Sequence, residues 1–182
     1  MESRVKRISG VKMRRTLDQY YTPSVAVNAF LDSIDFKLSG NVLEPFSGEG
    51  AISDALFERG FKVFTNDLDP NNKANHRLDL AIALNWNKLP PANWIITNPP
   101  FNLAPQVIPL AFNHCQSGLI VLLRLSYLEP CRNRVRFLQE YPPTQLWVTP
   151  RISFTGKGTD SITTAWFVWD KTNNLPNKIT IL

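Results

Sequence analysis

The feature that most constrains the fold is a succession of short apolar segments, each running directly into glycine or polar residues. The segments predicted to be strands in this series are 41–43, 61–65, 94–97 and 119–123. The last two are almost wholly apolar, as is typical of strands covered on both faces of a parallel sheet. Segments with helical spacing separate them, at 24–34, 51–59, 103–114 and 131–139. This alternation predicts a single-domain, doubly wound α/β fold with a mostly parallel sheet, and the segments 145–149 and 163–169 add an antiparallel C-terminal hairpin.

The basic residues are unevenly placed along the 182-residue chain, whose net charge is +5. Six of the first 15 residues are Lys or Arg, so we interpret residues 1–17 as a basic arm and 18–182 as the folded domain. Such clusters suit the phosphates of a nucleic acid, although a solvated surface accounts for charge alone equally well. The candidate phosphate contacts are Arg14, Arg15, Arg132, Arg134, Arg136 and Lys157.

Several classes of protein are disfavoured by what the sequence lacks. Two cysteines and two histidines, with no Cys-x-x-Cys or His-x-x-x-His pair, argue against a zinc site, so we expect no metal. No apolar run approaches the ~18 residues of a membrane span, and the basic start lacks the apolar core of a secretory signal. We therefore expect a cytoplasmic protein that does not enter a membrane.

A glycine turn follows the first predicted strand, in the run Glu44-Pro45-Phe46-Ser47-Gly48-Glu49-Gly50. Gly48 and Gly50 allow a tight turn and a close approach to a ligand. The third glycine of a dinucleotide-binding loop is absent, because Ser53 stands in its place. Glu44 and Glu49 disfavour a phosphate here and favour a ligand that carries an ammonium group.

Two aspartates complete a predicted cofactor site. Asp67 follows the second strand, where a carboxylate can accept both hydroxyls of a ribose. Asp79 is placed to accept from an adenine amino group, although an aspartate after a strand is often only a turn residue. A glycine loop, a ribose acid and a cationic ligand together indicate S-adenosylmethionine.

The catalytic candidate is the run Asn98-Pro99-Pro100-Phe101, directly after the 94–97 strand. Consecutive prolines stiffen this turn and remove two backbone donors. The Asn98 amide oxygen and the Pro99 carbonyl are then two candidate acceptors for the hydrogens of a planar amine, and the Phe101 ring can stack on its face. A strand ended by a Pro-Pro turn is the structural alternative.

The segments LEPFSGEGAI, NDLD and NPPF resemble those of class I S-adenosylmethionine-dependent amino methyltransferases, above all the compact phage- and prophage-type adenine-N6 DNA methyltransferases. The resemblance covers roughly residues 18–170 and implies the Rossmann-like class I methyltransferase fold. It implies that Tyr21 and Thr22, in a Tyr-x-Thr-Pro-like segment, close over the methionine part of the cofactor. Other implied cofactor contacts are Glu44, Pro45, Gly48, Gly50, Asp67, Asp79 and Asn98.

The resemblance implies methyl transfer to the exocyclic amine of adenine in DNA, by direct displacement onto a base flipped out of the duplex. Phe101 would stack on one face of that base and Phe154 on the other, unless Phe154 is a core residue. Methylation of an RNA base amine or of a protein glutamine is the first alternative, since the same loop serves both. A nucleic-acid-binding module without catalysis is the second.

Overall fold

The computed structural model describes residues 22–152 and 162–182. Its helices are α1 (Ser24–Ser33), α2 (Ala51–Glu58), α3 (Ala104–His114) and α4 (Val135–Glu140), with 3-10 turns η2 (Ala83–Lys88) and η3 (Leu125–Leu128). Its strands are β1 (Val42–Glu44), β2 (Val63–Thr65), β3 (Ala92–Thr97), β4 (Cys115–Arg124), β5 (Gln145–Val148), β6 (Thr164–Asp170) and β7 (Lys178–Ile181). The predictions at Arg14, Arg15, Tyr21, Phe154 and Lys157, and the boundary between 17 and 18, fall outside these residues.

Within the described residues the strands form one sheet in the order β2-β1-β3-β4-β6-β5-β7. β1 pairs in parallel with β2 and β3, and β3 pairs in parallel with β4. β6 runs antiparallel to both β4 and β5, and β5 runs parallel to the edge strand β7. The doubly wound, mostly parallel sheet and its antiparallel hairpin are thus confirmed.

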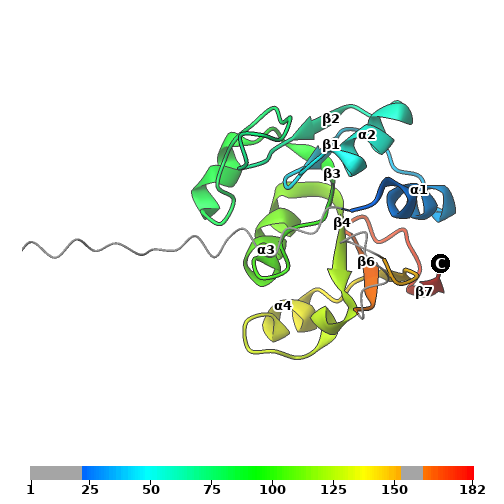
Figure 1. Cartoon of the computed structure of the whole chain (residues 1–182). Helices are drawn as coiled ribbons and strands as arrows, with labels where there is room; N and C mark the ends of the chain where they lie inside the picture. The colour runs from blue at the N-terminus through cyan, green and yellow to red at the C-terminus, as the bar shows by residue number, and fades with distance from the viewer. Residues whose placement is uncertain (1–21, 153–161) are drawn as a thin grey trace, which may run out of the picture.

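Helices cover both faces of the sheet (Figure 1). α1 and α2 pack on one face, where the core includes Phe30, Leu56 and Trp166. η2 and α3 pack on the other, around Ile108 and Phe167. Successive residues of β4 enter the two cores in turn, which explains why its sequence shows no polar alternation.

Gly118 makes the close packing of β3 and β4 possible. A Cβ atom at this position would lie 2.3 Å from the ring of Trp94 and 2.7 Å from the carbonyl oxygen of Trp169. Such distances are far inside van der Waals contact, so any side chain would push the neighbouring strands apart.

Some of the predicted elements differ from those in the structure. β4 begins at Cys115, four residues earlier than predicted, directly after α3 ends at His114. The basic helix predicted at 131–139 is only Val135–Glu140, since residues 132–134 form a turn. Strand β7 was not predicted.

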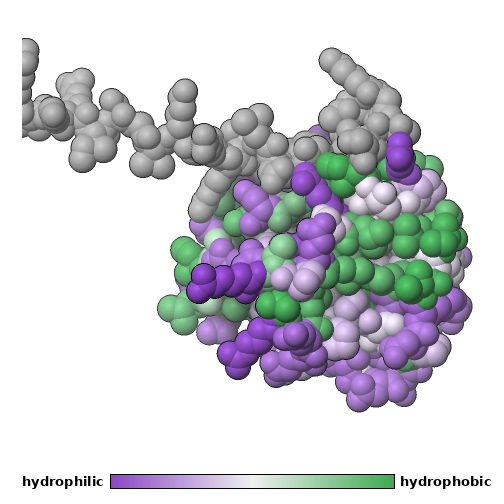
Figure 2. Space-filling model, turned by 90° about the horizontal axis from the view of Figure 1, so that it is seen from below, coloured by the Kyte–Doolittle hydropathy of each residue, from purple (hydrophilic) through white to green (hydrophobic). Residues whose placement is uncertain are grey.

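The outer surface mixes apolar and polar side chains. Figure 2, which views the molecule from below, shows hydrophobic side chains gathered between hydrophilic ones. On the edge strand β7, Ile179 and Ile181 are exposed. Among the described helices none has the length and apolar character needed to span a bilayer.

Candidate active site

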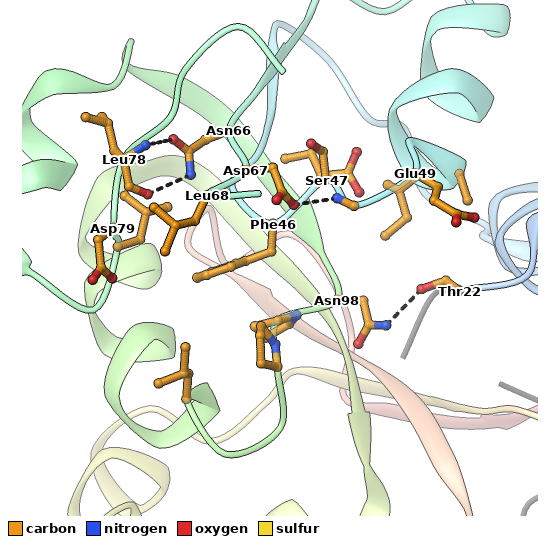
Figure 3. Close-up of a pocket in the computed structure, with 18 of the residues that line it drawn as sticks. Thr22, Phe46, Ser47, Glu49, Asn66, Asp67, Leu68, Leu78, Asp79 and Asn98 are labelled. Carbon is orange, nitrogen blue, oxygen red and sulfur yellow. Dashed lines mark hydrogen bonds between the residues drawn. The ribbon is translucent and has the colours of Figure 1, made fainter. Parts of the chain in front are cut away.

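A pocket lies at the carboxyl ends of β1, β2 and β3 (Figure 3). The chain leaves β1, forms β2 on one side and returns to form β3 on the other, so the strand order reverses at β1. Ligands of open α/β sheets bind at such a reversal. The predicted site residues that line the pocket are Thr22, Glu44, Gly48, Asp67, Asp79, Asn98, Pro99 and Pro100.

The glycine turn after β1 has the geometry its sequence requires. Gly48 and Gly50 adopt φ values of +51° and +95°, which side-chain-bearing residues rarely tolerate. Gly50 is the N-cap residue of α2. The Gly48 N–H donates to Oδ2 of Asp67 over 2.7 Å, so the aspartate after β2 fixes the turn after β1. Pro45 does not line the pocket, but its carbonyl accepts from Asn66.

Glu44 ends β1 with its carboxyl group buried at the pocket, and the residue is 1% exposed. Among the described residues its Oε2 has no hydrogen-bond partner. Burial raises the pKa of this carboxyl well above its usual value of 4.5; hydrogen bonding from Ser53 opposes the shift, and the nearby Asp54 and Asp67 add to it. A buried carboxyl with an unsatisfied oxygen favours a ligand that brings a cation or a hydrogen-bond donor.

The two predicted aspartates have different surroundings. Asp67 is buried, and its Oδ1 accepts from the Asp69 N–H and the Asn72 side chain, at 2.8 and 3.0 Å. Together with the bond from Gly48, these contacts hold the carboxylate in one orientation beside the pocket. Asp79 is half-buried and accepts from the Ala81 N–H. Both therefore shape their own turns as well as lining the pocket.

The apolar wall of the pocket consists of residues that were not among the predicted site residues. Phe46 extends between Asp67 and Asn98 in Figure 3, and Leu68 and Leu78 lie beyond it. Leu68 is 51% exposed although it is large and apolar. A flat, partly apolar ligand group would bury these side chains. Phe46 and Leu68 come shortly after β1 and β2, but nothing else in the sequence distinguishes them from core residues.

The Asn-Pro-Pro-Phe loop leaves β3 and leads into α3. The Pro100 carbonyl accepts from the N–H groups of Leu103 and Ala104, so the diproline turn is tied to the first turn of the helix. Nδ2 of Asn98 donates to Oγ1 of Thr22 over 2.9 Å. The amide is therefore anchored to the segment that precedes α1, at the same pocket that Glu44 and Asp67 line (Figure 3).

Phe101 lies beside the pocket rather than in its wall. The guanidinium carbon of Arg124, at the end of β4, is 4.7 Å from the centre of the Phe101 ring. This cation–π contact covers one face of the ring. Phe154, the second predicted stacking residue, lies outside the described residues, as does Tyr21.

The predicted basic cluster divides into two kinds of residue. Arg132 and Arg136 are exposed. The guanidinium of Arg134 donates to the carbonyls of Ser126 and Glu129, and it also stacks over the Tyr127 ring. Arg134 therefore holds the turn after β4, whatever else it contacts.

The described residues form no candidate metal site, and neither cysteine lines the pocket. Within 22–152 and 162–182, no three His, Cys, Asp or Glu side chains are grouped to hold a metal ion. Cys115 is buried at the start of β4, and burial raises the pKa of its thiol to about 11. A thiol with so high a pKa is a poor nucleophile at neutral pH.

Solved structures show the same fold. The chain superposes on a protein described as the modification subunit of a type I restriction enzyme from Vibrio vulnificus with a TM-score of 0.65 at 16% identity, covering 87% of this chain and 45% of that one. A protein described as an RNA methyltransferase from Pyrococcus horikoshii gives 0.62 at 17%, covering 87% of each. The 23S rRNA methyltransferase ErmE gives 0.60 at 12%, covering 87% of this chain and 71% of that one.

Sequence comparison adds no closer relative. No protein-family model matches the chain, and no curated protein matches it. The chain spans less than half the length of the Vibrio subunit. The structural likeness establishes that the chain has the Rossmann-like fold of class I S-adenosylmethionine-dependent methyltransferases.

Proposed function

We propose that the chain binds S-adenosylmethionine and transfers its methyl group to an exocyclic amine. The observation that carries this proposal is the buried Glu44, whose Oε2 has no hydrogen-bond partner among the residues that the structure describes and which lies in one pocket with Asn98. The methionine part of the cofactor carries an α-ammonium group that would satisfy Glu44. Asp67 and Asp79 line the same pocket and suit the ribose and the adenine amino group.

The apolar residues around the pocket fit the flat adenine ring of the cofactor. Phe46, Leu68 and Leu78 offer such a ring apolar contact. A pyrophosphate is disfavoured here, because the acidic residues Glu44 and Glu49 lie beside the turn and would repel it. The pocket therefore suits a nucleoside joined to an amino acid better than a dinucleotide.

We propose the amino group of adenine in DNA as the methyl acceptor. Its nitrogen is a weak nucleophile because its lone pair is delocalised into the ring. Hydrogen bonds to the Asn98 amide oxygen and the Pro99 carbonyl would draw the nitrogen toward tetrahedral geometry and stabilise the positive charge that develops on it. S-adenosylmethionine held by Glu44, Asp67 and Asp79 would supply an electrophilic methyl group to this nitrogen, and the methylated nitrogen would lose its extra proton to water.

The remaining residues are proposed to hold the base and its phosphates. Phe101, supported from behind by Arg124, would stack on a flipped base. Arg132 and Arg136 are exposed and would contact phosphates. Among the structural neighbours, a restriction-enzyme modification subunit is consistent with DNA as the partner.

RNA is the second candidate substrate. Two structural neighbours are described as methyltransferases of RNA, and one of them is named for 23S rRNA. An adenine amino group is the same acceptor in RNA and in DNA. What differs is the geometry of the nucleic acid around it.

The test is to incubate the protein with methyl-labelled S-adenosylmethionine and separate pools of DNA, RNA and protein, followed by digestion and mass analysis. N6-methyladenine in the DNA digest is the expected product. Label found only in RNA would refute DNA as the substrate and identify RNA instead. Label found only on glutamine would refute a nucleic-acid substrate.

A non-catalytic binding module predicts a different result. In a thermal-shift assay, S-adenosylmethionine at 100 times its dissociation constant should add about 2.7 kcal/mol of stability. Absence of any shift, with no label transferred to any pool, would favour the non-catalytic module.

A further inference from the structure

Thr22 joins the two halves of the site. It is 9% exposed, lies just before α1, and lines the same pocket as Glu44. Its Oγ1 accepts a hydrogen bond of 2.9 Å from Nδ2 of Asn98, a residue 76 positions later. One hydroxyl group is therefore shared between the ligand pocket and the catalytic loop.

The Thr22 hydroxyl can bond to Asn98 and to a ligand at the same time because it has one proton and two lone pairs. A lone pair receives the Asn98 N–H, so the proton of Thr22 is left to be donated. An acceptor for this proton would lie in the pocket that Thr22 lines. If Glu44 holds the ammonium of an amino-acid headgroup, the carboxylate of that headgroup is the matching acceptor.

The orientation of the Asn98 amide decides whether the loop can act. When Nδ2 donates to Thr22, Oδ1 is the atom of the amide whose chemistry allows it to accept from an amine. In the reversed orientation two N–H donors would face each other, and the amine would lose its acceptor. A hydroxyl that is free to rotate can donate to the amide oxygen or accept from the amide nitrogen, so it is compatible with both orientations of Asn98. A hydroxyl whose proton is already donated elsewhere can only accept, so it is compatible only with the orientation that places Nδ2 on Thr22.

We propose that Thr22 is the positioning residue that fixes the amide orientation of Asn98, and that it does so most strictly when a carboxylate in the pocket takes its proton. This inference rests on the proposed function for its ligand. The Thr22–Asn98 contact itself can be tested without any ligand. Thr22 acts through Asn98 and does not touch the reacting atoms.

The first test observes the Asn98 side-chain amide by NMR in the 15N-labelled protein. Thr22→Val is expected to shift the Asn98 NH2 signals and speed their exchange with water in the free protein. Thr97→Val is the matched control: Thr97 is the buried neighbour of Asn98, and its hydroxyl has no partner among the described residues. Unchanged Asn98 signals in Thr22→Val, or equal changes in Thr97→Val, would overturn the proposal.

The second test adds ligands to the same samples. S-adenosylhomocysteine carries the amino-acid headgroup, and 5′-methylthioadenosine lacks it. The former is expected to slow exchange of the Asn98 amide protons, and the latter to leave them as in the free protein. Equal slowing by both would refute the role of the carboxylate. Binding of neither would refute the proposed cofactor, whereas the comparison in the free protein would still decide the Thr22–Asn98 contact.

The third test is kinetic. Thr22→Val is expected to lower kcat about tenfold, and Thr22→Ser, which keeps the hydroxyl, to stay within about threefold of the wild type. In an Asn98→Asp background, where both ends of the side chain are oxygens, Thr22→Val should cost much less. Equal losses in the two backgrounds would show that Thr22 does not act through the amide.

Discussion

The buried carboxyl of Glu44 predicts that cofactor affinity depends on pH. In the free protein, burial raises its pKa well above 4.5, so the group is still protonated at pH values where an ordinary glutamate is charged. A bound ammonium group favours the carboxylate. Binding in this pH range should therefore release one proton, and affinity should rise about tenfold per pH unit until the raised pKa is passed.

The size of the change in cofactor affinity follows from replacing a neutral Glu44 carboxyl by a charged carboxylate as the partner of the ammonium group. A hydrogen bond to a charged group contributes about 1.5–3 kcal/mol, which is roughly a 10- to 150-fold change in affinity. Glu44→Gln has nearly the same shape and remains neutral. It should therefore bind S-adenosylmethionine with the weak affinity of the protonated wild type, at every pH up to about 7.7, where the cofactor's own amino group begins to titrate.

The raised pKa of Glu44 also predicts how the folding stability of the protein depends on pH. Because the folded pKa is raised, the contribution of Glu44 to stability is fully present below 4.5 and is lost as the pH rises through the folded pKa. Without cofactor, Glu44→Gln should therefore raise the Tm at pH 8 relative to the wild type and leave it nearly unchanged at pH 4. This measurement also verifies that the variant folds.

Isothermal titration calorimetry in two buffers of different ionisation enthalpy measures both the affinity and the protons released. We expect proton release from the wild type in the pH range above 4.5, and none from Glu44→Gln. A wild-type affinity that does not change with pH, or a Gln variant that binds as tightly as the wild type, would refute the assignment of Glu44 to the ammonium group.

Three further predictions follow from other contacts. Asn98→Ala should lower kcat by about two to three orders of magnitude, because a preorganised acceptor is lost, while calorimetry should find the cofactor Kd within about twofold of the wild type; retained turnover would exclude Asn98 from the reaction. Arg124→Met should raise the KM for nucleic acid several-fold by releasing Phe101, whereas an equal loss of cofactor affinity would indicate a folding defect. Gly118→Ala should cost about 1–3 kcal/mol in chemical denaturation through its collision with Trp94, and an unchanged midpoint would contradict the packing described.

The central strands could be predicted because their residues are constrained on both faces. Ile95 packs into one core and Ile96 into the other, so β3 appears in the sequence as a continuous apolar run. The start of β4 was not predictable in this way, because His114 ends α3 and Cys115 begins the strand with no glycine or proline between them.

The edge strand β7 was missed for a different reason. Its isoleucines, Ile179 and Ile181, are exposed, while Lys178 and Thr180 are half-buried. The usual link between apolar residues and burial is therefore reversed along this strand. What places β7 is its pairing with β5, which is a long-range interaction that no local pattern encodes.

Much of the polar part of the site was predictable because Gly48, Asp67 and Asn98 come shortly after β1, β2 and β3, and parallel strands bring their carboxyl ends to one edge. The sequence also indicated the glycines that the turn requires. The apolar wall was not predictable, because Phe46 and Leu68 look like ordinary core residues. The Thr22–Asn98 hydrogen bond depends on the folded chain bringing together residues 76 positions apart, so only the structure shows it.

The most direct test of the account is a crystal structure of the protein with S-adenosylhomocysteine and DNA that contains a target adenine. The account predicts the ligand's ammonium group within hydrogen-bonding distance of Glu44, and the adenine amino group on Oδ1 of Asn98, facing the sulfur atom. A ligand bound elsewhere, or an adenine amino group with no contact to Asn98, would contradict it.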